Sequence, residues 1–186
     1  MNYKDYQNSR DMAWKILLQE NVTELPVKVG DLCRQIGIRV AYFEAQDDDD
    51  GKSTIIDGQP WILIAKDKPI RRQRFTCAHE LGHILLGHTG KYKLVNREPS
   101  RGDNPIEQEA NVFASRLLAP ACVLWKLNAR TPAEISDLCD ISYRAAEFRA
   151  ARMQELYQRN KFLSHPLERA VYEQFADFIR NRGGLL

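Results

Sequence analysis

The stretch RFTCAHELGHILLGH, residues 74–88, decides how the rest of the chain is interpreted. It contains the pattern H-E-x-x-H at His79, Glu80 and His83. In a helix, two histidines four residues apart project from one face and can bind a single metal ion. The same helix has a predicted buried face formed by Phe75, Ala78, Gly82 and Leu85. The stretch therefore predicts a metal-binding helix that packs against a folded core.

Glu80 has a different predicted role from the two histidines beside it. It lies next to the metal-binding face, where its carboxylate can reach a water molecule instead of the metal. A carboxylate in this place can accept the proton of the attacking water and pass it to the leaving amine. The pattern therefore predicts a zinc-dependent peptidase with Glu80 as its catalytic residue.

A catalytic zinc site needs a third protein ligand and keeps its fourth position for water. His88 is one candidate, but the longer pattern H-E-x-x-H-x-x-G-x-x-H would need glycine and histidine where the chain has Leu86 and Thr89. Metzincins, the metallopeptidases with that pattern, are thereby excluded. His88 is instead expected at the helix C-terminus, where an imidazole interacts favourably with the helix dipole.

The second candidate ligand is a glutamate from the helix expected over residues 106–118. Glu109 shares a stripe with Phe113 and Leu117 and is expected to face inward. Glu107 is expected on an exposed side of the same helix. This geometry favours Glu109 over Glu107 as the third zinc ligand. A salt bridge from Glu109 to a nearby arginine is the alternative interpretation.

The remaining patterns predict an α+β fold. Two helices are expected in the first forty residues, followed by strands over 38–44, 53–56 and 61–65, with a hairpin turn at Asp57–Gly58. A polar loop is expected over 89–105, and only helices after residue 120. We expect a minimal zincin-like metallopeptidase domain with a small antiparallel sheet over 1–125. A helical extension is expected over 126–186.

Composition restricts the classes of protein that fit. The apolar share of 44% and the net charge of +2 are ordinary for a globular domain and show no strong preference for nucleic acid. No apolar run approaches the ~18 residues that a membrane span needs. The N-terminus has no signal-peptide core, and four cysteines are scattered without a C-x-x-C pair. A cytoplasmic protein is therefore expected.

Two motifs together resemble a known family. They are R-Q-R-F-T-x-A-H-E-L-G-H over residues 72–83 and E-x-E-A-N-x-F-A-x-x-L-L-x-P over 107–120, and they resemble the ImmA/IrrE metallopeptidases. The resemblance implies a cytoplasmic zinc peptidase that cleaves a helix-turn-helix transcriptional repressor. It thereby derepresses genes of mobile elements or of a stress response. By the same resemblance, the ligands are His79, His83 and Glu109, and Glu80 is the acid/base.

Two alternatives remain open at this stage. One is a catalytically weak zinc protein that acts by binding a repressor. The other is DNA binding by residues 135–153, which resemble helix-turn-helix spacing. That reading is less favoured, because Ser136 and Asp140 replace the usual small residue and turn glycine. The sequence does not indicate an oligomeric state.

Overall fold

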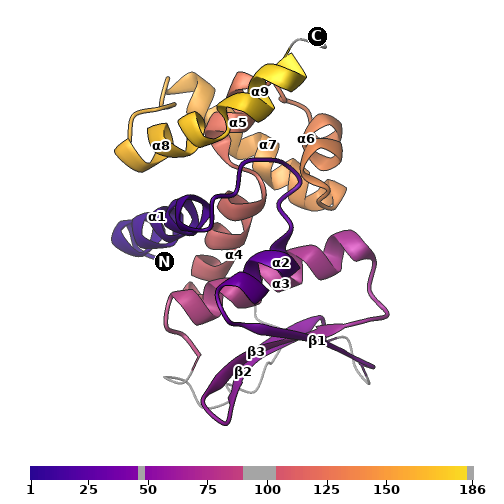
Figure 1. Ribbon diagram of the computed structural model, residues 1–186. Helices are drawn as coiled ribbons and strands as arrows, with labels where there is room; N and C mark the ends of the chain where they lie inside the picture. Colours follow the sequence, from indigo (N-terminus) through magenta and orange to yellow (C-terminus); the bar gives the residue numbers. More distant parts are fainter. Residues whose placement is uncertain (46–48, 90–103, 184–186) are drawn as a thin grey trace. The chain divides into compact units, whose positions relative to one another are not determined.

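A computed structural model describes residues 1–45, 49–89 and 104–183 (Figure 1). These residues form α-helices and a three-stranded sheet, so the predicted α+β class is confirmed. The predicted loop over 89–105 lies almost entirely outside the described residues. The elements are α1 (Tyr3–Gln19), α2 (Val29–Gln35), β1 (Arg39–Phe43), β2 (Gly51–Ile56), β3 (Gln59–Ala65), α3 (Ile70–Leu85), α4 (Pro105–Leu118), α5 (Ala121–Lys126), α6 (Pro132–Cys139), α7 (Tyr143–Gln158), α8 (Pro166–Gln174) and α9 (Ala176–Gly183).

Internal contacts divide the chain into two compact units. The first consists of Met1–Met12 and Val29–Ala114, and the second of Ala13–Lys28 and Ser115–Leu186. These bounds differ from the predicted boundary after residue 125. The second unit begins earlier in the chain and also takes in residues from the N-terminal region. The division falls inside α1 and inside α4.

The sheet of the first unit has the strand order β1-β3-β2. β2 and β3 form the predicted antiparallel hairpin, and Asp57 and Gly58 both have positive φ, as a tight hairpin turn requires. β1, however, pairs with β3 in parallel, so the prediction of a purely antiparallel sheet is wrong. The chain leaves β1, passes the central strand and enters the sheet again at its far edge as β2. The residue pattern of each strand is the same for parallel and antiparallel pairing, so the parallel pairing of β1 could not be predicted from it.

The core of the first unit lies between the sheet and two helices. α2 and α3 lie on the same face of the sheet (Figure 1). Ile62 and Ile64 of the central strand point to one face and are almost fully buried, as are Ala78 and Leu81 of α3. This packing fixes α3, and the residues it carries, relative to β2 and β3.

The second unit contains the helices α5 to α9. Thr131 opens α6 with a full capping box and Ser142 caps α7. The end of the chain forms two helices, because α8 ends at Gln174 and α9 begins at Ala176. None of the helices in the described part of the chain is long and apolar enough to cross a lipid bilayer.

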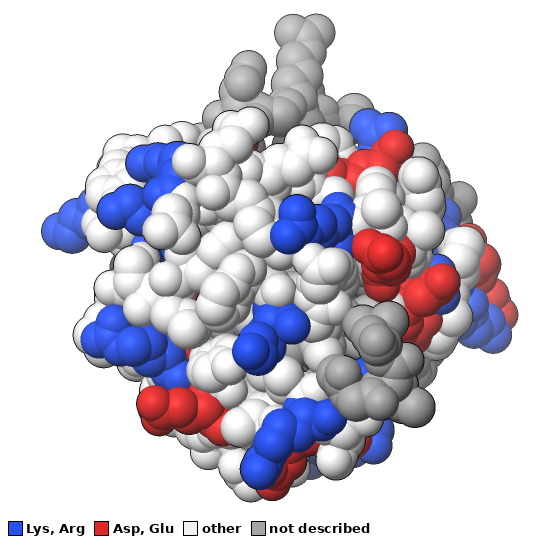
Figure 2. All heavy atoms as spheres, turned by 90° about the horizontal axis from the view of Figure 1, so that it is seen from above, with Lys and Arg blue, Asp and Glu red and all other residues white. Residues whose placement is uncertain are grey.

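The surface shows charges of both signs. On the face seen in Figure 2, Lys and Arg side chains stand in separate groups with uncharged surface between them. This distribution agrees with the small net charge of +2.

Candidate metal centre

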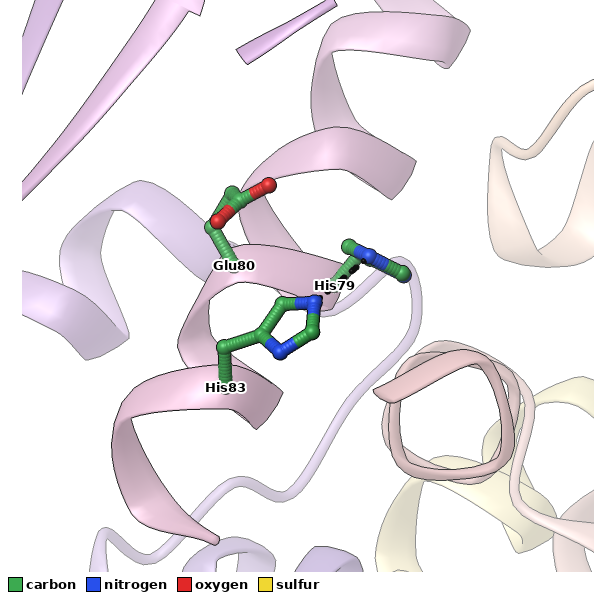
Figure 3. A group of neighbouring side chains, drawn as sticks. All are labelled: His79, Glu80 and His83. Carbon is green, nitrogen blue, oxygen red and sulfur yellow. Dashed lines mark hydrogen bonds between the residues drawn. The ribbon is translucent and has the colours of Figure 1, made fainter. Parts of the chain in front are cut away.

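The two histidines of the H-E-x-x-H pattern face each other on α3. Their rings project from successive turns of the helix, as Figure 3 shows. The Nε2 atoms of His79 and His83 lie 3.0 Å apart. His83 is buried and His79 is half-buried. The structure therefore brings together the two predicted histidine ligands, with one nitrogen of each directed to the same point.

Glu107, from α4, completes this cluster. Its Oε2 lies 3.1 Å from Nε2 of His79, and its Oε1 lies 3.4 Å from Nε2 of His83. The expectation that Glu109 would face the two histidines, with Glu107 exposed, is corrected by this geometry. Glu109 instead lies 3.4 Å from Nε2 of His88. The two glutamates of the motif have exchanged their predicted places.

The reason lies in which residues form the buried stripe of α4. Ala110 and Ala114 are fully buried together with the larger residue Phe113. Glu107 precedes these alanines by three and seven residues, which is the spacing of a shared helix face. The prediction used only the large side chains and therefore placed the centre of the stripe too near Glu109. Counting the alanines as core would have identified Glu107 from the sequence.

A glycine lets α4 approach α3 closely enough for this contact. A Cβ atom built on Gly82 would lie 2.9 Å from a ring carbon of Phe113 and 3.3 Å from Cα of Ala110. Real Cβ atoms essentially never come this close to a neighbour, so any side chain at Gly82 would move α4. Gly82, between the two histidines, therefore sets the distance from α3 to the helix that carries Glu107.

The three ligand atoms fit a zinc ion. Zinc bonds to histidine nitrogen and carboxylate oxygen are about 2.0–2.2 Å long, so tetrahedral ligand atoms are separated by roughly 3.3 Å. The observed separations among Nε2 of His79, Nε2 of His83 and the carboxylate of Glu107 are 3.0, 3.1 and 3.4 Å. Two nitrogens and one oxygen are also a common donor set of catalytic zinc sites.

Each histidine has a polar partner at its other nitrogen. Nδ1 of His79 lies 3.0 Å from Oδ1 of Asn111, and Nδ1 of His83 lies 3.1 Å from Nδ1 of His88. Asn111 accepts from His79, because an amide oxygen cannot donate. His79 therefore carries a proton on Nδ1, and Nε2, which faces Glu107, is the nitrogen that would bind a metal. The sequence analysis did not identify Asn111, although it lies one turn after Glu107 on the same helix.

Glu80 lies near the two histidines, and its carboxylate has a hydrogen-bond partner on the sheet. One ligand atom from each of His79, Glu80 and His83 lies within 4.8 Å of the others. The Glu80 side chain is only 2% exposed, and its Oε2 accepts a hydrogen bond of 2.8 Å from the hydroxyl of Ser53. Ser53 belongs to the edge strand β2. The contact joins the predicted acid/base to the sheet, and sequence reasoning did not find it.

The surroundings of Glu107 and Glu109 shift the pKa values of the two carboxyl groups in opposite directions. Hydrogen bonds from His79 and His83 hold the pKa of Glu107 well below its usual range. Burial raises the pKa of Glu109, and the nearby negative charge of Asp5 adds to this effect. Glu107 is therefore the carboxylate that stays ionised most readily, as a metal ligand must be.

The helix pair α6–α7 is the second surface that the sequence singled out. Ser136 is buried and donates to the Ile141 carbonyl at 2.8 Å, and Asp140 has φ of 50° in the turn. These two residues thus take the conformations usual for the small residue and the turn glycine. The exposed face of α7 nevertheless carries Tyr143 and Phe148, with Arg144 over the Phe148 ring. Arg149 of α7 is buried and donates to the Ala119 carbonyl, so it is not exposed for contact with a phosphate backbone.

An H-E-x-x-H helix on a small sheet, with a glutamate from the next helix against both histidines, defines a minimal zincin-like metallopeptidase. The chain matches the peptidase family model described as the IrrE N-terminal-like domain over residues 33–156. It therefore belongs to the ImmA/IrrE family of metallopeptidases, as the motifs predict. No curated protein was found to be significantly similar to the chain.

Proposed function

We propose that the chain is a zinc-dependent endopeptidase. His79, His83 and Glu107 would hold the metal, and Glu80 would act as the acid/base. The observation that carries this proposal is the convergence of two imidazole nitrogens and the Glu107 carboxylate, with separations of 3.0–3.4 Å, beside the buried carboxylate of Glu80. Membership in a metallopeptidase family supports it.

A bound zinc ion acts as a Lewis acid and makes water a nucleophile at neutral pH. The protein's own part is to fix geometry and to move protons. Ser53 donates to Oε2 of Glu80 and so orients the carboxylate that would accept the proton of the attacking water. The same carboxyl then gives this proton to the leaving amine. Asn111 keeps His79 in the tautomer in which Nε2 can bind the metal.

The edge strand β2 is the place where a peptide substrate would pair. The other strand of the hairpin, β3, is the central strand of the sheet and pairs on both sides. β2 lies at the edge of the sheet in the part of the chain that the structure describes, and its Ser53 contacts Glu80. An extended peptide added to this edge would therefore pass close to the acid/base.

We further propose that the substrate is a helix-turn-helix transcriptional repressor and that cleavage takes place in the cytoplasm. The support is the family resemblance of the motifs over residues 72–83 and 107–120. Such a substrate must present an extended segment to β2, since strand pairing requires extended backbone. A loop or linker of the repressor is therefore the expected cleavage region.

The test uses Glu80→Gln, with the exposed Glu24→Gln as a matched control. Glu80→Gln should keep one zinc per chain and slow cleavage of the candidate repressor by about 10²–10⁴-fold, because an amide cannot accept the proton. Glu24→Gln should behave as wild type. Zinc is measured by elemental analysis and cleavage on a gel. A wild-type protein that binds no zinc, or a fully active Glu80→Gln, would refute the proposal.

A further inference from the structure

The side chains of His83, His88 and Glu109 are connected by two successive polar contacts. Nδ1 of His83 lies 3.1 Å from Nδ1 of His88, and Nε2 of His88 lies 3.4 Å from Oε2 of Glu109. We propose that His88 and Glu109 are positioning residues that hold His83 with its Nε2 directed toward the metal. The inference rests on the proposed function for the identity of the metal ligands.

The way in which α3 ends places His88 against His83. Gly87 has φ of 74°, and its N–H donates to the Ile84 carbonyl at 3.1 Å. The N–H of His88 donates to the His83 carbonyl at 2.9 Å. These two bonds form the Schellman motif, which brings the side chains of its first and last residues together. That contact is commonly apolar, but here it joins two imidazole rings. Local backbone geometry thus fixes the pair.

One assignment of ring protons satisfies both contacts of this series, from His83 to His88 and from His88 to Glu109. Nε2 of His83 must be without a proton to bind a metal, so the neutral ring carries its proton on Nδ1 and donates to His88. Nδ1 of His88 then accepts, and its own proton is on Nε2. That proton faces the carboxylate of Glu109, which accepts it. Each donor meets an acceptor, and His83 is held in the tautomer that a metal requires.

Burial makes these contacts effective. The side chains of His88 and Glu109 are 11% and 15% exposed, so little water competes for their polar atoms. The contact also accounts for the inward position of Glu109, a charged residue near the core that is not directed at Nε2 of either metal-binding histidine. Its partner is a ring instead of the metal. Partners of this kind commonly contribute about 10–100-fold to metal affinity.

The first experiment compares two substitutions of His88. His88→Phe keeps a ring but removes the acceptor, and zinc affinity should fall by about 10–100-fold in competition with a chelating dye. His88→Asn places an amide oxygen near the position of Nδ1 and should keep most of the affinity. Circular dichroism and thermal melting of the metal-free variants check the fold. If folded His88→Phe binds zinc as tightly as wild type, the proposal is overturned.

A double-mutant cycle then tests whether Glu109 acts through His88. Glu109→Ala should weaken zinc binding in the wild-type background. In the His88→Asn background, which lacks the ring nitrogen that faces Glu109, the same change should have almost no effect. An equal loss in both backgrounds would mean that Glu109 binds the metal directly, which would overturn the proposal.

A measurement on the metal-free protein separates this inference from the proposed function. Nitrogen-15 NMR of the histidine rings should show His83 with a proton on Nδ1 in the wild type and a smaller Nδ1-protonated fraction in His88→Phe. A wild-type His83 without a proton on Nδ1 would overturn the positioning role. Failure of the wild type to bind zinc refutes the proposed function alone, because the NMR measurement uses the metal-free protein.

Discussion

The two histidines of the H-E-x-x-H pattern stand four residues apart on α3, and each has a different polar partner at its Nδ1 atom. His79 contacts Asn111 of α4, which lies 32 residues further along the chain. His83 contacts His88, which lies five residues away at the end of the same helix. The His79 side therefore depends on how α4 packs against α3, whereas the His83 side depends on how α3 ends. The two histidines of one short motif are therefore oriented by different kinds of contact, one with a neighbouring helix and one with the end of their own helix.

The largest effect is expected where both sides meet, at Glu107. Glu107→Ala removes the carboxylate that faces both Nε2 atoms. Zinc affinity should fall by more than the ~100-fold that outer contacts can contribute, and peptidase activity should be lost. Competition with a chelating dye measures the affinity, with circular dichroism as the check on folding. If Glu109→Ala had the larger effect, the arrangement of α4 described above would be wrong.

A substitution of Asn111 removes the hydrogen bond at Nδ1 of His79 and leaves the contact between His83 and His88 in place. Asn111→Leu keeps the approximate shape of the side chain but removes the acceptor of His79 Nδ1. Zinc affinity should fall by about 10–100-fold, comparable to the loss expected for His88→Phe. Asn111→Asp retains an acceptor oxygen and serves as the matched control. Unchanged affinity in Asn111→Leu would show that packing alone orients His79.

A smaller effect is expected at Ser53, which contacts neither histidine in the described structure. A hydrogen bond to a carboxylate contributes at least about 1.5 kcal/mol, so Ser53→Ala should lower kcat by about tenfold. Zinc affinity and KM should hardly change. Ser53→Thr keeps the hydroxyl, and Thr54→Ala alters the neighbouring residue on the other face of β2. Loss of zinc in Ser53→Ala would assign it a structural role instead.

The smallest effect concerns stability, and it compares two helical glycines. Gly82→Ala gains about 1 kcal/mol of helix propensity but incurs about 1–3 kcal/mol from overpacking against Phe113. Gly30→Ala in α2 meets nothing within 4 Å and should stabilise the protein by about 0.5–1 kcal/mol. Urea denaturation gives both values. A Gly82→Ala protein that gains as much as Gly30→Ala would contradict the close approach of α4.

Features that depend on a few neighbouring residues could be predicted from the sequence. The α3 helix, the hairpin turn at Asp57–Gly58 and the capping box at Thr131 each follow from a local pattern, and each is present. The parallel pairing of β1 with β3 could not be predicted, because it depends on where the chain enters the sheet again after the residues between β1 and β2. Pairing between distant segments leaves no periodic signal in either strand.

The candidate site shows the same limit at the level of single residues. The helical pattern correctly placed His79, Glu80 and His83 together. It placed Glu109 instead of Glu107 against the two histidines, because two buried alanines were not counted in the stripe of α4. Ser53 carries no pattern of its own, and only the packing of β2 beside α3 brings its hydroxyl to Glu80. Zinc binding and catalysis themselves remain predictions.

The Schellman motif at Gly87 and His88 has a consequence for the order in which the site forms. Closing a loop costs chain entropy of about (3/2)RT ln n. For the separations of 32 and five residues to Asn111 and His88, the two contacts differ by about 1.6 kcal/mol. The His83 pair can therefore form with α3 itself, early in folding. Asn111 and Glu107 reach the histidines only when α4 docks, and they leave together when it separates. A partly opened protein would keep one oriented histidine, ready for the rest of the site to close around it.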